Sequence, residues 1–491
     1  MSYHKYLTKK PVVELFDEIK NDTFERTLGP IQLILIGIGA VIGAGIFIIA
    51  GNAAGEHAGP AITLSFILGG IACAMAGLCY AELSSTIPIS GGAYTYIYAS
   101  LGELAAWLIL GMILLTYVLG AASVASGWSS YLTSFLADYH IHIPPHLSNT
   151  TGKILTLADG SSVTAWIDLP AFFIVILLTM VVYRGAKTAA WINTLIVSVK
   201  MVILTLFIGI GIFYIDPANW IPYIPENTGV AGEFGFSGIL SGTAVVFLAF
   251  TGFDAVATTA QEAKNPQKNL PIGILVSLLV CTIFYVLISG VLTGIVHYTK
   301  LNVSQPLALA VDSMNLPWFS VVMKVGAISG LTTVILVLIY AAVRVLYAVT
   351  YDGLLPNFLA KKHPKYHTPH VLTIVVGLTI SLLASTLPLS KLVKLSNFGT
   401  LVTFAAVCFA TLYMRYKMPN LPRGFKCPLV PYVPLAGMIL FCQIIGAFPN
   451  EIFIYAGIWT LFLLVIYFSY SQFHSVLLKE IEVGKVKEDL D

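Results

Sequence analysis

One apolar run near the start of the chain contains a cluster of glycines in its middle. Residues 31–50 read IQLILIGIGAVIGAGIFIIA, which is long and apolar enough to cross a bilayer. Gly37, Gly39, Gly43 and Gly45 lie within nine residues of one another. Glycine in a helix interior costs roughly 1 kcal/mol relative to alanine, and irregular backbone at membrane depth is tolerated only where it is buried or lines a cavity. The sequence therefore predicts a helix that breaks at Gly43-Ala44-Gly45 and frees backbone groups for a ligand.

The composition places the rest of the chain in a membrane as well. The 491 residues are 57% hydrophobic and 10% charged, whereas soluble domains carry about 25% charged residues. We therefore expect an all-α integral membrane protein in a lipid bilayer, with no nucleic-acid partner. About twelve apolar runs are long enough to span. They lie near residues 31–55, 60–87, 103–135, 166–184, 187–213, 236–262, 271–297, 316–349, 370–387, 396–416, 430–447 and 451–472.

The basic residues predict the orientation of these spans. Most of the lysines and arginines fall in the terminal segments 1–30 and 473–491 and in alternate loops. Cytoplasmic loops carry the excess of basic residues, so both termini are expected in the cytoplasm of a plasma membrane, or of the inner membrane if the host is bacterial. The segments assigned to the outside hold only Lys153, Lys300, Lys391 and Lys394.

A second apolar run is interrupted at a corresponding position. Within 236–262, the sequence Phe250-Thr251-Gly252-Phe253-Asp254 puts a glycine and an acid inside a span. The first and sixth runs then begin two halves, 31–213 and 236–416, of a five-plus-five repeat with opposite orientations. Interrupted segments at matching positions indicate a transporter site near the midplane. Close helix packing through small residues is the alternative explanation.

The chemistry of two such breaks suits a zwitterion. Half-helix N-termini expose N–H groups and partial positive charge, which favour a carboxylate. Unwound carbonyls and half-helix C-termini favour an ammonium group or a cation. Two breaks that cross at the midplane therefore form a plausible amino-acid site from backbone alone.

Several motifs in order make a family resemblance specific. They are IGIGAVIGAGIF, AELSSTIPISGGAYTY (81–96), FTGFDAV with EAKNPQKNLPIGI (250–274), and Arg344 followed by YDGLLP (351–356). Together they resemble the amino acid–polyamine–organocation superfamily, and within it the cationic amino acid transporter family and its bacterial members. The resemblance covers nearly all of 25–472. It implies the inverted-repeat fold of the sodium-coupled leucine transporter, with helices 1 and 6 unwound and residues 430–472 outside the repeat, and amino acid uptake that is commonly proton-coupled.

The same resemblance implies which residues bind substrate. Relatives often carry a glutamate where this chain has Thr116. A buried cationic side chain needs an anionic partner, so Thr116 favours a neutral amino acid, although Asp254 remains nearby. The implied substrate-binding residues are Gly43, with the N–H groups of Ala44 and Gly45 for the carboxylate; the carbonyls of Val41, Leu248 and Thr251, beside Gly252, for the ammonium; and Thr116, Phe253 and Leu338 for the side chain.

A lysine lies deep within the fifth run. Lys200 is thirteen residues beyond Lys187, roughly 20 Å along a helix axis and too deep for easy snorkelling. The family resemblance places it opposite the first break, where sodium-coupled relatives bind an ion, so no sodium is expected there. An ionisable residue at this depth indicates function, and burial disfavours its charged form. We hypothesise that protonation of Lys200 couples transport to protons; a fixed structural cation is the alternative.

Other charges are weaker candidates for gates. Glu82 is either a gate or proton-path residue or an ordinary acid at a helix end. Arg344 either pairs in a cytoplasmic gate, with Asp352 following in the inner loop, or snorkels. Asp254 is a third candidate gate residue, whereas Glu262 is expected in solvent or headgroups.

Three classes of function remain in competition. The leading hypothesis is a secondary active permease that takes up a neutral amino acid with protons by alternating access. A proton-independent amino acid or amine exchanger, or a cationic amino acid transporter, is the alternative, and a membrane sensor ranks last. No nucleophile–base set or metal spacing indicates an enzyme, a metal or another cofactor. A small accessory membrane subunit is compatible with the sequence but not indicated by it.

Overall fold

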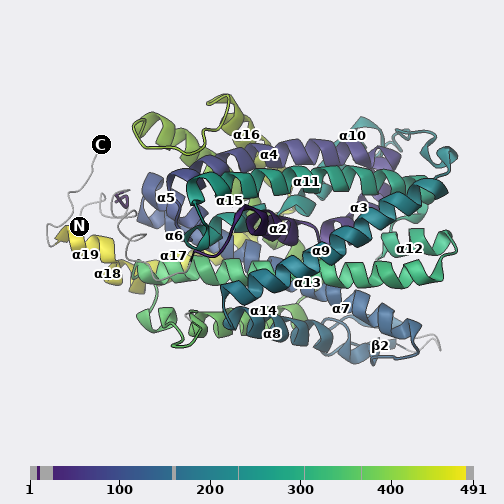
Figure 1. Cartoon of the computed structure of the whole chain (residues 1–491), viewed down its shortest axis with the longest axis horizontal. Helices are drawn as coiled ribbons and strands as arrows, with labels where there is room; N and C mark the ends of the chain where they lie inside the picture. The colour runs from purple at the N-terminus through teal and green to yellow at the C-terminus, as the bar shows by residue number, and fades with distance from the viewer. Residues whose placement is uncertain are drawn as a thin grey trace.

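The computed structural model describes residues 8–11, 26–156, 162–230, 232–303, 305–366 and 368–482. Most of these residues are helical, and the long helices run along the longest dimension of the molecule (Figure 1). Seven helical stretches in the described chain are long and apolar enough to cross a membrane. They are Pro30–Thr86, Glu103–Asp138, Lys187–Tyr214, Pro266–Ile295, Pro317–Tyr351, Leu389–Lys417 and Asn450–His474. The multi-pass helical class expected from the sequence is therefore confirmed.

The elements follow one another with few long loops. Those in the first part are α2 (Pro30–Val41), η2 (Gly45–Ile49), α3 (Ala50–Ala53), η3 (Ala54–Ala58), η4 (Gly59–Ala61), α4 (Ile62–Thr86), α5 (Ala93–Leu101), α6 (Glu103–Leu114), η5 (Leu115–Leu119), α7 (Gly120–Asp138), η6 (Pro145–Leu147), β1 (Ile154–Thr156), β2 (Ser162–Thr164), α8 (Leu169–Tyr183), α9 (Ala186–Gly211), η7 (Ile212–Tyr214) and η8 (Pro217–Trp220). Those in the second part are α10 (Gly235–Phe247), η9 (Leu248–Phe250), η10 (Phe253–Glu262), α11 (Pro266–Ile295), η11 (Tyr298–Lys300), α12 (Pro306–Ser313), α13 (Pro317–Tyr351), η12 (Asn357–Ala360), α14 (His370–Thr386), α15 (Leu389–Lys417), α16 (Tyr432–Gly446), α17 (Asn450–Ile466), η13 (Tyr467–Ser471), α18 (Gln472–His474) and α19 (Val476–Glu482).

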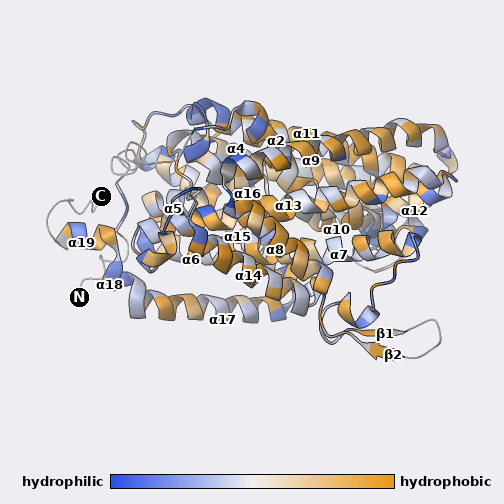
Figure 2. Cartoon of the chain, turned by 60° about the horizontal axis from the view of Figure 1, so that its bottom comes forward, coloured by the Kyte–Doolittle hydropathy of each residue, from blue (hydrophilic) through white to orange (hydrophobic). Residues whose placement is uncertain are grey.

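Three elements differ from the sequence-based expectation. Helix α15 begins at Leu389 rather than at residue 396, so Lys391 and Lys394 lie in its first turns and not in an outside loop. Helix α5 forms where only a connection between runs was expected. The polar segment after α7 contains an antiparallel hairpin of β1 and β2, with Leu155 opposite Val163, which projects from the bundle (Figure 2).

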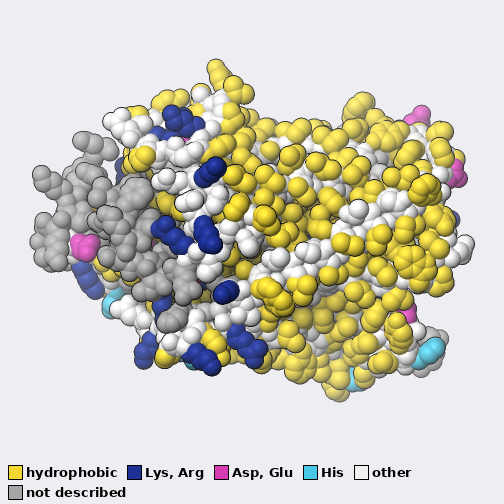
Figure 3. All heavy atoms as spheres, viewed as in Figure 1, with side chains coloured by type: hydrophobic (Ala, Val, Ile, Leu, Met, Phe, Trp, Pro, Cys, Tyr) yellow, Lys and Arg dark blue, Asp and Glu magenta, His cyan; other side chains and the backbone are white. Residues whose placement is uncertain are grey.

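The surface separates into an apolar belt and two polar ends. Hydrophobic side chains cover most of the face shown in Figure 3, and Phe213 and Phe236 are among the most exposed apolar side chains of the protein's described part. On that face, lysines and arginines gather toward the end that carries α18 and α19, which we call the basic end, whereas the acidic and histidine side chains at the opposite end are few. Of the predicted terminal segments 1–30 and 473–491, residues 1–7, 12–25 and 483–491 lie outside the described residues.

The short helix α2 occupies the interior of the bundle. It packs against α9, α11, α13 and η10, and its residues from Ile36 to Val41 are buried. The burial of this second half of α2 suits its lack of any charged residue, because a helix that is apolar on every face must be covered on every face. The helix therefore ends, and its backbone becomes irregular, inside protein rather than in lipid.

Candidate substrate site

The first break lies at Ile42 and Gly43. Helix α2 ends at Val41, Ile42 has extended backbone with ψ of 99°, and helical structure resumes at Ala44 before the π-helical η2. The break therefore begins just before the predicted Gly43-Ala44-Gly45. The first N–H groups of a helix have no intrahelical acceptor, and those of Ala44 and Gly45 stand in this position.

The second break is centred on Gly252. Helix α10 gives way to the 3-10 turn η9, and η10 continues to Glu262 as a 3-10 helix rather than as the α-helix expected from the run 236–262. Gly252 has φ of +111°, and a Cβ there would lie 2.9 Å from the Ala40 carbonyl oxygen. Only glycine fits both the left-handed backbone and this close approach to α2.

The two breaks cross in direct backbone contact. A Cβ on Gly45 would lie 2.2 Å from the Cβ and 2.5 Å from the Cα of Ala249. Tyr285 of α11 lies beside the crossing, with its hydroxyl 2.8 Å from the carbonyl oxygens of both Val41 and Ala249. A phenol has one proton to donate, so these two carbonyls share one donor. Sequence reasoning missed Tyr285 because nothing in α11 marks it apart from other buried tyrosines.

A cavity of about 70 Å³ opens at the crossing. Seven of the residues implied by the resemblance line it, whereas Gly43 and Phe253 do not; the Leu248 side chain lies outside the described part of the structure. Phe253 packs instead against the rings of Tyr80 and Phe404. The lining residues are Ala40, Val41, Ala44, Gly45, Ile49, Thr116, Gly120, Ser123, Val124, Ala249, Thr251, Gly252, Val334, Leu338, Val393, Ser396 and Asn397.

Helix α15 contributes a polar wall that the sequence did not predict. Ser396 donates to the Thr116 carbonyl at 3.0 Å, and Thr400 lies 3.3 Å from the Thr116 hydroxyl. Asn397 adds a carboxamide to the lining. The signal was missed because the predicted span began at residue 396, which put these side chains at a membrane surface instead of within the helix.

The ammonium of Lys200 lies against the end of α2. Lys200 is fully buried, and its Nζ donates to the carbonyls of Ile38 at 3.2 Å, Gly39 at 3.3 Å and Ile42 at 2.8 Å. Its fourth contact is the Thr333 hydroxyl of α13 at 2.9 Å. The structure thus brings the lysine of α9 to the first break. Ile42 adjoins Val41, which lines the cavity, so Lys200 and the cavity share one short segment of backbone.

Asp254 lies behind the cavity in a group of aromatic residues. One of its carboxylate oxygens accepts a hydrogen bond of 2.6 Å from Tyr117, and the other has no hydrogen-bond partner among the described residues. The hydroxyls of Tyr80 and Tyr96 are also buried without a partner there. Asp254 does not line the cavity, so it is positioned beside the substrate site and not within it.

Glu262 and Arg344 form a buried ion pair between the end of η10 and α13. Their side chains are 3% and 4% exposed, and Tyr340 donates to the same carboxylate. The expectations that Glu262 lies in solvent and that Arg344 snorkels are therefore wrong. Each charge has its partner inside the protein, which offsets the cost of burying it.

Two backbone hydrogen bonds lie beside this ion pair. Leu28 donates to the Glu262 carbonyl at 2.9 Å and accepts from Lys264 at 2.8 Å, which makes a parallel bridge between Leu28 and Ala263. The segment before α2 is thereby tied to the segment after η10. The bridge and the ion pair with Arg344 both involve Glu262, so the segment before α2, the end of η10 and α13 are held together at this residue.

Asp352 does not pair with Arg344. Its carboxylate pairs with Lys10 and accepts a hydrogen bond of 2.8 Å from Tyr94. The Asp352 carbonyl accepts from the backbone of Val476 at 3.0 Å. Asp352 therefore joins the end of α13 to the described part of the N-terminal segment and to α19.

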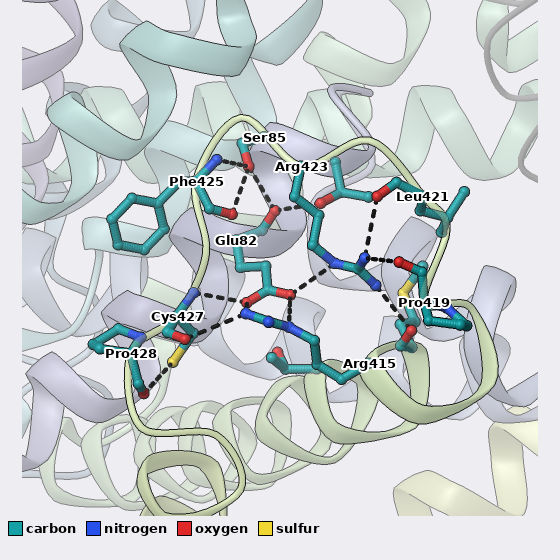
Figure 4. Close-up of polar contacts among 12 residues, drawn as sticks. Glu82, Ser85, Arg415, Pro419, Leu421, Arg423, Phe425, Cys427 and Pro428 are labelled. Atoms are coloured by element: carbon teal, nitrogen blue, oxygen red, sulfur yellow. Dashed lines mark hydrogen bonds and ion pairs between the residues drawn. The ribbon is translucent and has the colours of Figure 1, made fainter.

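Glu82 is held by a dense set of donors at the end of α4 (Figure 4). Its carboxylate accepts two hydrogen bonds from Arg415, at 2.7 and 2.6 Å, one from Arg423 at 3.0 Å and one from the Cys427 backbone at 2.7 Å. All four lone-pair positions of a carboxylate are then in use. This geometry fixes the loop between α15 and α16 to α4. It also leaves no free lone pair on the Glu82 carboxylate to accept a proton during transport.

The fold and the site together define a class of protein. An irregular, ligand-sized interior at the crossing of two broken helices, inside an apolar belt, is the architecture of a membrane transporter and not of an enzyme. A family model described as amino acid permease matches residues 28–469. The chain belongs to this family, and the resemblance found in its motifs is confirmed.

Relatives cover almost the whole chain. The methylthioribose transporter of Bacillus subtilis is 43% identical over 96% of this chain and 99% of its own length. The branched-chain amino acid permease of the same organism is 41% identical over 96% and 98%. The vacuolar cationic amino acid transporter 4 of Arabidopsis thaliana is 34% identical over 84% of this chain and 68% of its own length. The chain is thus a member of a family of secondary amino acid transporters.

Proposed function

We propose that this permease takes up a neutral amino acid together with protons by alternating access. The observation that carries the proposal is the crossing of two broken helices at a cavity. In this proposal the bundle has twelve spans, with inverted repeats at 31–213 and 236–416 and the last two helices, within 430–472, outside the repeat. The pairing of α2–η2 with α10–η10, each broken near its middle, supports that arrangement.

The backbone at the crossing supplies both poles for a zwitterion. The N–H groups of Ala44 and Gly45 bind the carboxylate at the start of a half-helix. The ammonium group binds the carbonyls of Val41, Leu248 and Thr251. None of the described residues that line the cavity carries a charged side chain, so a charged substrate side chain would lie unpaired at low dielectric. This favours a neutral amino acid over a cationic one.

Protonation of Lys200 acts on the same backbone. The charged ammonium has three protons to donate, and it faces three carbonyls and one hydroxyl. Loss of its proton removes both the charge and one donor, so the carbonyls from Ile38 to Ile42 lose their main stabilising partner. Because Val41 lies within this segment, the proton and the substrate each change the binding of the other.

Uptake into proteoliposomes tests the coupling. The wild-type protein should accumulate alanine when the outside is more acidic than the lumen, and Lys200→Ala should still bind alanine without acid-driven accumulation. Lys324→Ala is the matched control, because Lys324 is also a buried lysine but pairs with Asp138 at 2.5 Å, away from α2. Unchanged acid-driven accumulation by Lys200→Ala refutes the coupling. Counterflow of two amino acids without any pH gradient supports the exchanger instead.

We propose a cytoplasmic location for the basic end, in the plasma membrane. The gathering of lysines and arginines at that end supports it (Figure 3). With α19 at the basic end, the C-terminus is cytoplasmic, and an even number of spans puts the N-terminus on the same side. Labelling of single cysteines added at Lys479 and at Lys153, by a membrane-impermeant maleimide on intact cells, tests this. Only the position at Lys153 should react.

Methylthioribose is a second candidate substrate. The relative with 43% identity carries this substrate in its name, and the cavity wall of Thr116, Ser396 and Asn397 offers hydrogen bonds to sugar hydroxyls. Competition between alanine and methylthioribose for binding to the purified protein separates the two candidates. If only methylthioribose binds in this competition, the cavity is a site for the sugar and not for an amino acid.

A further inference from the structure

Asn397 presents an unused carboxamide to the substrate cavity. It lies on α15, two turns from the helix start, and lines the cavity while only 6% of its surface is exposed. Its side chain makes no hydrogen bond to any residue in the described part of the chain. Buried amides normally have partners, and an unpartnered one facing a cavity points to a ligand.

The neighbouring polar side chains differ from Asn397 in this respect. Ser123 donates to the Gly120 carbonyl at 2.8 Å, Thr116 to the Met112 carbonyl at 3.0 Å, and Ser396 to the Thr116 carbonyl at 3.0 Å. Their hydroxyl protons are therefore already used in hydrogen bonds within the protein. Asn397 keeps two N–H donors and one carbonyl acceptor for whatever fills the cavity.

Other side chains that line the cavity are aliphatic. They include Val334 and Leu338 of α13 and Ile49 of η2. None of the described residues that line the cavity is charged, so the cavity accommodates a small uncharged group that meets both polar and apolar side chains. An aliphatic group that filled the same space would displace water from Asn397 without replacing its hydrogen bonds.

We propose that Asn397 selects substrates whose side chain carries an uncharged hydrogen-bonding group, a hydroxyl or an amide, over aliphatic substrates of the same shape. This inference rests on the proposed function, because it takes the backbone crossing as the place of the zwitterion and α15 as the contact for the side chain. Every amino acid has the carboxylate and the ammonium group that Ala44, Gly45 and Val41 contact in this proposal. Asn397 then distinguishes among them.

Isosteric pairs of amino acids isolate this contact. Threonine and valine differ by a hydroxyl in place of a methyl, and asparagine and leucine differ by an amide in place of an isopropyl end. Titration calorimetry on the purified full chain should show the polar member of at least one pair binding about tenfold more tightly, the factor expected for one hydrogen bond to a group otherwise left unpaired. Equal or tighter binding of the aliphatic member in both pairs overturns the proposal, whatever the variants do.

The isosteric variant Asn397→Leu should abolish or reverse the preference. Thr403→Val is the matched control, because Thr403 is buried on the same helix, donates to the Gly399 carbonyl at 2.8 Å and does not line the cavity. The control should keep the wild-type ratio. An unchanged ratio in Asn397→Leu refutes the role of Asn397, and the smaller Asn397→Ala provides the same test if the leucine variant does not fold.

Alanine separates this inference from the proposed function. Its side chain is too short to reach across the cavity, so its binding reports the zwitterion poles alone. If alanine and both pairs bind without polar preference, the inference about Asn397 fails and the proposed function stands. If no amino acid binds a folded wild-type protein, both fail.

Discussion

Replacing Gly45 with alanine tests whether the two breaks meet as the structure shows. The added methyl would lie 2.2 Å from the Ala249 Cβ, and ordinary contact begins at 3.4 Å. The second-nearest atom is the Ala249 Cα, at 2.5 Å, and backbone cannot rotate away as a side chain can. The two half-helices must therefore separate by about 1.2 Å, an overpacking strain of about 1–3 kcal/mol.

That separation is large relative to a hydrogen bond. An N–H···O contact of about 2.9 Å, lengthened by this amount, is no longer a hydrogen bond. A zwitterion held by both breaks then loses at least one charge-assisted bond, worth about 1.5–3 kcal/mol. We expect Gly45→Ala to bind alanine about 10- to 100-fold more weakly than the wild type, with a lower unfolding temperature.

Calorimetric titration and thermal unfolding of the purified protein measure these two effects. Gly457→Ala serves as the control, because a Cβ at Gly457 in α17 would meet no atom within 4 Å. That variant should bind as the wild type and be slightly more stable, since alanine is the better helix former. If Gly45→Ala binds and transports as well as Gly457→Ala, the breaks do not cross in the binding conformation, and the proposed site is wrong.

Three further substitutions probe the surrounding structure. Tyr285→Phe keeps the ring but removes the donor shared by the two breaks, so substrate affinity in titrations should fall about tenfold with little loss of thermal stability. Glu262→Gln leaves the buried Arg344 without its counter-charge and should lower the free energy of unfolding by about 3–5 kcal/mol, seen as a large drop in unfolding temperature; a small drop contradicts the closed pair. Burial raises the pKa of Asp168, just before α8, to about 6, so the native state holds this proton more tightly than the unfolded chain and stability falls as pH rises toward 6. Asp168→Asn should therefore melt at a higher temperature than wild type at pH 7.5 and at an equal temperature near pH 4.

The sequence predicted the features that follow from lipid and from local backbone. Apolar length located most spans, and Gly43, Gly45 and Gly252 located both breaks, because the cost of glycine in a helix is a local property. The depth of Lys200 followed from its distance along one helix. These inferences needed no knowledge of which helices are neighbours.

The sequence could not predict contacts between segments that are distant along the chain. Tyr285 and Asn397 resemble ordinary interior residues of α11 and α15, and only the packing brings them to the breaks. The partner of Arg344 was misjudged because Asp352 is close in sequence, whereas Glu262 is close in space. The expectation for Glu262 failed for the same reason: Arg344 and Tyr340, far away in the sequence, pack against this acid and bury it.

The bridge between Leu28 and Ala263 has a consequence for how such a protein can change over time. Its two hydrogen bonds join main-chain atoms, so substitutions at these positions leave the donors and acceptors in place, proline excepted. The neighbouring pair of Glu262 and Arg344 can be altered by a single codon change. Substitutions of Glu262 or Arg344 can therefore change how readily the basic end opens. Substitutions hardly affect the backbone hydrogen bonds, so these bonds keep a minimum strength of closure.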